Sequence, residues 1–354
     1  MRGILVTGGA GFVGSWLALS LKQAFGTARV IALDSLRRRG SEYNLDRLRT
    51  AGVEFLHGDV RNPDDLAACG PVDVLVEASA EPSVLAGYDG ASRYVVDTNL
   101  GGAVNCLELA RRHGAVFVFL STSRVYPVEP LNRLRLIETD TRFELAPEQP
   151  YPGVSAAGIS EDFPLEGSRS LYGATKLAAE LLATEYQALY GFPVVINRCG
   201  VLAGPWQMGR ADQGIVAFWA ARHVYGGALR YIGYGGSGRQ TRDMLHPRDL
   251  ARLVLEQIRH PERFAVRPWN VGGGRAVSVS LRELTALCAA ASGNRVPVTL
   301  DPEPRPADIP LYLSDHSALT AACGWEPEIS AETIVEEVVQ WLRDHESALR
   351  PVFT

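Results

Sequence analysis

Three glycines spaced three residues apart follow the first apolar run of the chain and constrain how it can fold. They stand between Ile4–Thr7, which predicts a buried strand, and the helical pattern Gly14–Ala24. Residues without side chains let the backbone turn tightly and approach a ligand, and the N-terminus of the next helix attracts phosphate. Glycine spacing alone is weak evidence, but strand, turn and helix occur together here, which predicts a dinucleotide site. The expected contacts are Gly8, Gly11, Phe12, Val13 and Gly14.

Short β-branched runs alternate with longer helical patterns through the first half of the chain. Such alternation implies right-handed βαβ crossovers and a parallel sheet. The predicted fold class is therefore α/β, a Rossmann-type doubly wound parallel sheet with a smaller interleaved C-terminal domain. Further strands are expected at Val30–Asp34, Val53–Leu56, Val74–Glu77, Val116–Ser121, Val194–Arg198 and Trp269–Val271, and helices at Thr98–His113, Tyr172–Tyr190, Pro247–Ile258, Leu281–Ala291 and Ala331–His345.

Asp34 ends the second expected strand, 20 residues after Gly14. A carboxylate there accepts hydrogen bonds from the adenosine ribose and repels a 2′-phosphate, which favours NAD over NADP. The run Arg37–Arg39 leaves NADP open as the alternative, since arginines would hold that phosphate. Residues after the third and fourth strands would line the adenine edge and the dinucleotide cleft, and they are Asp59, Val60, Ala78, Ser79 and Ala80.

Tyr172 and Lys176 stand four residues apart on an expected helix and therefore share one face. A free tyrosine, whose pKa is near 10, is too weakly acidic to act as a base at neutral pH. A neighbouring lysine cation favours the phenolate, and Lys176 would also bond the nicotinamide ribose. Thr122 closes the fifth strand at the edge where α/β proteins bind ligands, and it would share the substrate oxygen with Tyr172. Its alternative role is a strand-end hydroxyl tied to the backbone.

These motifs together resemble the extended short-chain dehydrogenase/reductase family, the group of nucleotide-sugar epimerases and dehydratases. The likeness covers nearly the whole chain, including Thr98-Asn99, Ser121-Thr122-Ser123 and the C-terminal Arg305-Pro-Ala-Asp308. It implies an NAD-binding Rossmann domain at residues 1–203, which also receives parts of about 243–273. The substrate-binding domain would lie mainly at 204–354.

The resemblance also implies roles for individual residues. Thr122, Tyr172 and Lys176 take the catalytic positions, while Asn99 and Cys199 fall beside the cofactor. A homodimer through the helices around Thr98–His113 and Tyr172–Tyr190 is expected. Substrate contacts are expected at Ser123, Arg124 and Gln213, and the nucleotide diphosphate would be held by Gln240, Arg242 and Arg305.

One departure from the wider family separates the possible reactions. Sugar 4,6-dehydratases of this type carry an Asp-Glu pair after the threonine, because dehydration needs an acid and a base. Ser123 and Arg124 stand there instead. Several stretches are most similar to the 2-epimerases of CDP-sugars, and the resemblance implies C2 epimerisation through a transient keto sugar. These stretches are Arg38–Leu45, Ala80–Gly87, Ser121–Tyr126, Gly158–Leu165, Gln240–His246 and Asp308–Tyr312. The alternatives are a UDP-sugar 4-epimerase or another nucleotide-sugar oxidoreductase, and a non-catalytic dinucleotide-sensing protein.

Composition and charge indicate which classes of partner the chain is not expected to bind. A net charge of −5 and a pI near 5.9 give no general reason to expect nucleic acid or a membrane as partner. Five scattered cysteines without a C-x-x-C pair predict neither a disulfide framework nor a metal site. No apolar run approaches the roughly 20 residues that span a bilayer. Met1 and Arg2 lead directly into the first strand, so we expect a cytoplasmic protein.

A polar, proline-rich stretch at residues 127–169 is long for a loop. Long ordered loops often have a function, so this one would cap the site and exclude water from it. The equally weighted alternative is a mobile surface loop.

Overall fold

The computed structural model describes residues 2–88, 90–210 and 213–353, and the chain divides into two compact units. Unit 1 contains the chain up to Val125, together with Ser170–Arg198 and Pro247–Trp269. Unit 2 contains Tyr126–Arg169, Cys199–His246 and the chain after Trp269. Each unit is therefore assembled from three separate stretches of sequence. The expected domain boundary at residue 203 stays a prediction.

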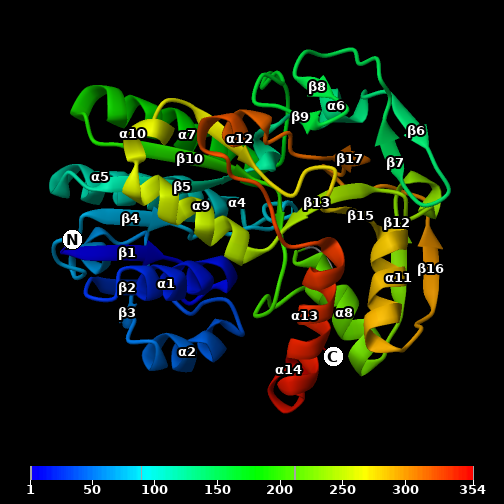
Figure 1. The fold of residues 1–354 in the computed structure, drawn as a ribbon, viewed down its shortest axis with the longest axis horizontal. Helices are drawn as coiled ribbons and strands as arrows, with labels where there is room; N and C mark the ends of the chain where they lie inside the picture. Colours follow the sequence, from blue (N-terminus) through cyan, green and yellow to red (C-terminus); the bar gives the residue numbers. More distant parts are fainter. Residues whose placement is uncertain (1, 89, 211–212, 354) are drawn as a thin grey trace. The chain divides into compact units, whose positions relative to one another are not determined.

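A seven-stranded sheet forms the centre of unit 1 (Figure 1). The pairs β2–β3, β1–β2, β1–β4 and β4–β5 are parallel. Most of these strands are short apolar runs, as parallel strands covered on both faces are. This confirms the predicted α/β fold class. In sheet order the strands are β14 Pro268–Val271, β10 Val194–Cys199, β5 Val116–Thr122, β4 Val74–Glu77, β1 Gly3–Thr7, β2 Arg29–Asp34 and β3 Glu54–His57.

The helices of unit 1 pack in pairs, α1 with α9 and α5 with α7. Small buried side chains on α7, including Ala179 and Ala183, share a core with Leu107 and Ala110 of α5. Small residues let two helices approach closely, and α7 also packs on β5. The helices are α1 Phe12–Ala24, α2 Leu45–Thr50, α3 Pro63–Ala67, α4 Ser92–Val96, α5 Gly102–His113, α7 Leu171–Tyr190, α9 Pro247–Arg259 and α10 Pro261–Phe264.

The helix expected at Thr98–His113 differs from the prediction at its start. Helical backbone begins at Ser92, continues through a π turn at Asp97–Gly101 and runs on as α5. Asp97, Thr98 and Asn99 are residue types that favour helix N-caps, which explains the expected start. Here they lie inside the helix, and the wide turn between them is a feature often found at functional sites.

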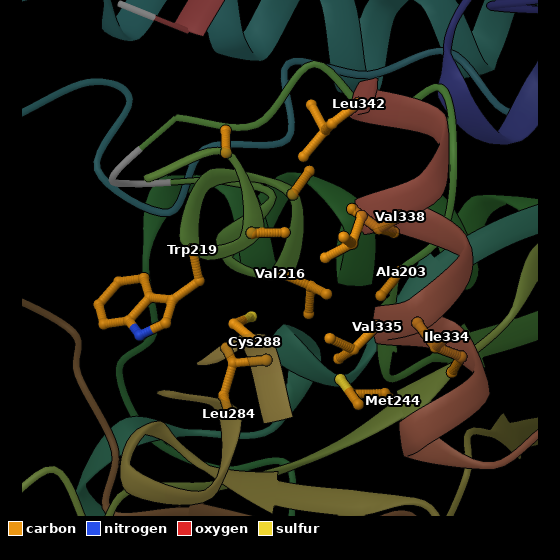
Figure 2. Close-up of a cluster of buried hydrophobic side chains, with 14 of the residues drawn as sticks. Ala203, Val216, Trp219, Met244, Leu284, Cys288, Ile334, Val335, Val338 and Leu342 are labelled. Atoms are coloured by element: carbon orange, nitrogen blue, oxygen red, sulfur yellow. The ribbon is translucent and has the colours of Figure 1, made fainter. Parts of the chain in front are cut away.

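Unit 2 has its own core, which forms around α13 (Figure 2). Ile334, Val335, Val338 and Leu342 recur at helical spacing on one face of α13, which packs against α8 and α11. The helices are α8 Ile215–Tyr225, α11 Leu281–Ser292, α12 Ser317–Cys323, α13 Ala331–Asp344 and α14 Glu346–Phe353. The strands are β11 Val201–Leu202, β13 Thr241–Leu245, β15 Ser278–Ser280 and β17 Leu311–Tyr312 in one sheet, and β12 Leu229–Ile232 with β16 Val298–Asp301 in another.

The proline-rich stretch before Ser170 has secondary structure of its own within unit 2. It holds one short helix and two antiparallel ribbons, and Arg142 bonds both the carboxylate of Glu283 and the backbone oxygen of Ser278. The segment is thus a built part of unit 2, although a capping role stays a prediction. Its elements are α6 Val128–Asn132, β6 Leu136–Glu138, β7 Phe143–Leu145, β8 Val154–Ser155 and β9 Gly158–Ile159.

Candidate active site

The glycine turn between β1 and α1 has the close contacts that the spacing predicts. Gly8 adopts φ +62°, and a Cβ there would lie 2.8 Å from the carbonyl oxygen of Ala78. A Cβ at Gly14 would overlap the carbonyl oxygen of Gly8. Gly11 is the N-cap of α1 and provides no side-chain cap, so the helix begins with a bare first turn at Phe12. A backbone cradle of this kind fits a pyrophosphate, since a side chain would fill it.

Asp34 lies at the end of β2 and is bonded to the glycine turn. Its carboxylate accepts hydrogen bonds from the backbone amides of Ala10, at 3.1 Å, and of Leu36, at 2.8 Å. Burial raises the pKa of Asp34, and these backbone amides together with that of Gly11 oppose the rise. Arg37, the first of the three arginines, stacks over the ring of Tyr94 at 4.0 Å.

The residues expected to line the adenine edge and the dinucleotide cleft make ion pairs, packing contacts and hydrogen bonds within unit 1. The hydrogen bonds from Arg61 hold the pKa of Asp59 below its usual range. Val60 is buried against Gly102, so its side chain belongs to the core. Asn99 bonds the backbone of Glu81 and, at 3.3 Å, the hydroxyl of Thr175 on α7.

Helix α7 carries Tyr172 and Lys176, and its start is fixed by its cap. Ser170 accepts a hydrogen bond from the amide of Gly173, which sets Tyr172 in the first turn. Lys176 is 2% exposed, and its Nζ donates to the Leu120 carbonyl at 2.9 Å. The same helix therefore brings Lys176 to the end of β5.

Thr122 is the last residue of β5 and is buried. Its Oγ1 accepts a hydrogen bond of 3.2 Å from the amide of Arg124, within the short turn Ser123–Val125. This is the contact expected of the alternative role of Thr122, a strand-end hydroxyl tied to the backbone. It uses an oxygen lone pair, so the hydroxyl hydrogen stays able to donate to a substrate oxygen.

Glu77 is a buried residue of the site that sequence reasoning missed. It stands at the end of β4, is 1% exposed, and its Oε2 lies 3.2 Å from Nζ of Lys176. The available signal was a carboxylate that closes an apolar strand directly before Ala78-Ser79-Ala80. A charge in such a strand needs a buried partner.

The residues expected to hold the nucleotide diphosphate lie in unit 2. Arg242, on β13, is 3.3 Å from the carboxylate of Asp308, whose amide bonds the carbonyl of Arg305. Arg242 and the turn that follows Arg305 are thus neighbours. The side chain of Gln240 donates to the carbonyl of Ile232, and the backbone of Gln213 is hydrogen-bonded to that of Arg210. Cys199, also in unit 2, ends β10 and is buried.

Residues 2–88, 90–210 and 213–353 contain neither a candidate membrane-spanning helix nor a candidate metal cluster. No helix in those ranges has the length and apolar character to cross a membrane. No cluster of three or more histidine, cysteine or acidic side chains there is arranged to hold a metal ion.

The sheet order, the glycine turn and the helix bearing Tyr172 and Lys176 define a Rossmann-type nucleotide-binding protein. The model of the NAD dependent epimerase/dehydratase family matches residues 4–272, and the chain belongs to that family. The resemblance, the fold class and NAD as the cofactor of the family, all expected from the sequence, are confirmed.

Three relatives show the range of reactions among similar proteins. CDP-paratose 2-epimerase of Salmonella typhi is 29% identical, over 96% of this chain and 98% of its own. UDP-glucose 4-epimerase of Thermus thermophilus, solved with NAD, has a TM-score of 0.75 and 27% identity, over 97% and 99% of the two chains. The dTDP-glucose 4,6-dehydratase DesIV of Streptomyces venezuelae, also solved with NAD, has a TM-score of 0.79 and 27% identity, over 99% and 100%.

Proposed function

We propose that this chain is an NAD-dependent epimerase of a nucleotide-sugar, and that it inverts C2 of a CDP-sugar of the paratose or tyvelose type. The observation that carries the proposal is the set Thr122, Tyr172 and Lys176, together with the identity of the two residues directly after Thr122, which are Ser123 and Arg124. Serine and arginine do not form the acid and base pair that dehydration needs, whereas epimerisation needs only a reversible hydride transfer and one base. The likeness to CDP-paratose 2-epimerase supports C2 as the carbon that is inverted and CDP as the nucleotide of the substrate.

The cofactor proposal rests on the residues of the glycine turn. The bare first turn of α1 would hold the pyrophosphate, and Asp34 would bond the adenosine ribose. A carboxylate at this place favours NAD over NADP. NAD, when bound, supplies the removal and the return of a hydride at the sugar carbon.

Each side chain of the catalytic set has a defined role in this proposal. Tyr172 removes the proton of the C2 hydroxyl, and Thr122 donates a hydrogen bond to the same oxygen. Lys176 stabilises the phenolate and bonds the nicotinamide ribose. The keto sugar then rotates within the site so that the opposite face of C2 receives the hydride. Tyr172 returns the proton to the C2 oxygen. For the substrate we propose Gln240, Arg242 and Arg305 at the diphosphate, with Ser123, Arg124 and Gln213 as further contacts.

A UDP-sugar 4-epimerase is the second candidate, supported by the solved relative from Thermus thermophilus. It would use the same catalytic set on a different carbon. A protein that only senses the dinucleotide would have no use for the tyrosine and lysine, which are both present.

The test is to incubate the purified protein, without added cofactor, with CDP-paratose and a panel of UDP-, GDP- and CDP-hexoses. Products are identified by proton NMR. Inversion at C2 of a CDP-sugar is the expected result. Inversion at C4 of a UDP-sugar would replace the first candidate with the second, and a strict need for added NAD(P)H would contradict both epimerases.

The role of Tyr172 has its own test. Tyr172→Phe removes the proposed base, and we expect turnover to fall by about 10²- to 10⁴-fold. Tyr186→Phe on the same helix is the control, because that hydroxyl bonds Glu108 instead. Near-normal turnover of the Tyr172 variant would exclude it as the base.

We also propose that the protein is a homodimer through α5 and α7. The solvent-facing side of α7 carries Leu181, Leu189 and Tyr190, which are 63%, 70% and 52% exposed. Exposed apolar side chains gathered on one helix are typical of an interaction surface, and a second copy of the chain is the proposed partner.

A further inference from the structure

Glu77 occupies a place in the sheet where a charge is costly. Its neighbours across β1 and β5 are Thr7 and Phe119, and all three side chains are buried. Isolated charges are not stable in such surroundings, so a buried carboxylate must be paired and hydrogen-bonded. The partners of Glu77 therefore indicate why it is there.

Both oxygens of the Glu77 carboxylate are used. Oε2 pairs with Nζ of Lys176 at 3.2 Å, and Oε1 accepts the hydroxyl of Ser79 at 2.6 Å. The Ser79 hydroxyl also lies 3.2 Å from that of Thr7, the residue before the glycine turn. A continuous polar chain thus runs from the start of the cofactor turn to the lysine of α7.

The ammonium of Lys176 has three hydrogens to donate. One is directed to Glu77 and one to the carbonyl of Leu120. The cation also lies over the Phe119 ring, 4.4 Å from its centre, which further limits its position. One hydrogen is left for a ribose hydroxyl, so pairing with Glu77 and holding the cofactor are compatible.

The other titratable groups near Lys176 do not replace Glu77. On α7, Glu180 pairs with Arg198 at 2.7 Å and accepts the hydroxyl of Ser121. On α5, burial raises the pKa of Cys106 well above its usual value, so this thiol carries no charge. Tyr172 lies four residues before Lys176 on the same helix. In the described chain, Glu77 is the only carboxylate in an ion pair with Lys176.

We propose that Glu77 is a positioning residue that keeps Lys176 charged and fixed at the end of β5, and that through Lys176 it sets the pH at which Tyr172 ionises. The proposal rests on the proposed roles of Tyr172 and Lys176. Without Glu77, a buried amine gives up its proton rather than remain an unpaired charge. Tyr172 then loses the cation that stabilises its phenolate.

The test follows Tyr172 directly in protein stripped of cofactor. The ultraviolet absorption of phenolate is titrated against pH, and the Tyr172→Phe spectrum is subtracted to isolate one residue. In Glu77→Gln the midpoint should rise by about one pH unit or more, the usual effect of losing a nearby opposite charge. Glu180→Gln is the matched control, because it breaks a second buried ion pair of α7. Its melting temperature should fall while its Tyr172 midpoint stays in place.

Lys176→Met separates this inference from the proposed function. It should raise the midpoint as Glu77→Gln does, and the double variant should match Lys176→Met alone, because Glu77 acts through the lysine. The double variant also removes both members of the buried pair, which is commonly tolerated when one removal is not. An unchanged or lower midpoint in Glu77→Gln, with Lys176→Met shifted, would overturn the Glu77 role only. No shift in Lys176→Met would overturn both.

Discussion

Asp243 shows how a buried carboxylate is held without the cation that Glu77 has. It lies on β13, and its Oδ2 accepts hydrogen bonds from the backbone amides of Gly274, at 3.3 Å, and Ser314, at 3.2 Å. Burial raises its pKa to about 6, because backbone dipoles compensate a desolvated charge less fully than an ion would. The residue therefore links the stability of unit 2 to pH.

This link predicts the sign of a pH effect. The pKa in the folded state exceeds the ordinary value of 3.8, so the stabilisation is complete below pH 4 and is lost as pH rises through about 6. Asp243→Asn cannot ionise, so relative to wild type it should gain up to about 3 kcal/mol of unfolding free energy between pH 4 and pH 7. Urea unfolding at several pH values measures the difference. A difference that is constant with pH would contradict the prediction.

At the scale of elements, the β1–α1 turn allows a matched pair of glycine substitutions. A Cβ at Gly14 would overlap the Gly8 carbonyl, whereas one at Gly26 would have nothing within 4 Å. Gly14→Ala should weaken NAD binding about tenfold or more, because the turn must open to admit the methyl group. Gly26→Ala should bind NAD as wild type does. Calorimetric titration of stripped protein measures both, and equal affinities would exclude the turn as the cofactor site.

The β6–β7 ribbon gives a second prediction about an element. Arg142 bonds Glu283 and Ser278, and the Phe143 amide next to it donates to Arg239, close to Gln240 and Arg242. Arg142→Leu should lower the unfolding free energy by about 1–3 kcal/mol, because the Ser278 carbonyl loses its guanidinium donor and Glu283 keeps only the hydrogen bonds from Thr141 and Ser280. It should also raise KM for the nucleotide-sugar more than it lowers kcat.

Arg135→Leu is the control for that substitution. Arg135 lies beside the same ribbon, but its ion pair with Glu148 is exposed and 3.4 Å long. We expect a change within about 0.5 kcal/mol. Equal effects of the two variants would mean that Arg142 does not anchor the ribbon.

The sequence predicts most elements well because buried parallel strands are apolar runs and α7 has clear ends. The fifth strand was expected at Val116–Ser121 and extends one residue further. The π turn at Asp97–Gly101 was missed, because its polar residues have the local chemistry of a cap. Which role they take depends on contacts with distant parts of the chain, such as that of Asn99 with Thr175.

The same limit applies to the candidate site. The spacing of Tyr172 and Lys176 is a local helical pattern, so it can be read directly from the sequence. The ion pair of Lys176 with Glu77 joins residues 99 positions apart. A carboxylate at the end of an apolar strand signals a buried partner without identifying it, and the register of β1, β4 and β5 sets Glu77 at the level where it meets the lysine.

At the scale of the whole molecule, the exposed apolar side of α7 predicts the oligomeric state. Light scattering should give twice the chain mass of 38.4 kDa for wild type. Leu181→Glu combined with Leu189→Glu should give the single mass, because two buried unpaired charges would oppose association. Leu300→Glu, at an equally exposed leucine of β16, should stay dimeric. A monomeric wild type, or a dimeric double variant, would contradict the proposed interface.

The segmented make-up of unit 1 also has a consequence for synthesis on the ribosome. Helix α9, which packs on α1, and the edge strand β14 are encoded after two of the three segments of unit 2 have already been translated. The nascent unit 1 therefore stays incomplete, with the α9-facing side of α1 uncovered, until residues 247–269 have left the ribosome. Hydrophobic surface exposed for that interval is a site for chaperone binding and for aggregation. A synonymous codon change that slows translation just before Pro247 should thus lower the yield of soluble protein, although the amino-acid sequence of that protein is unchanged.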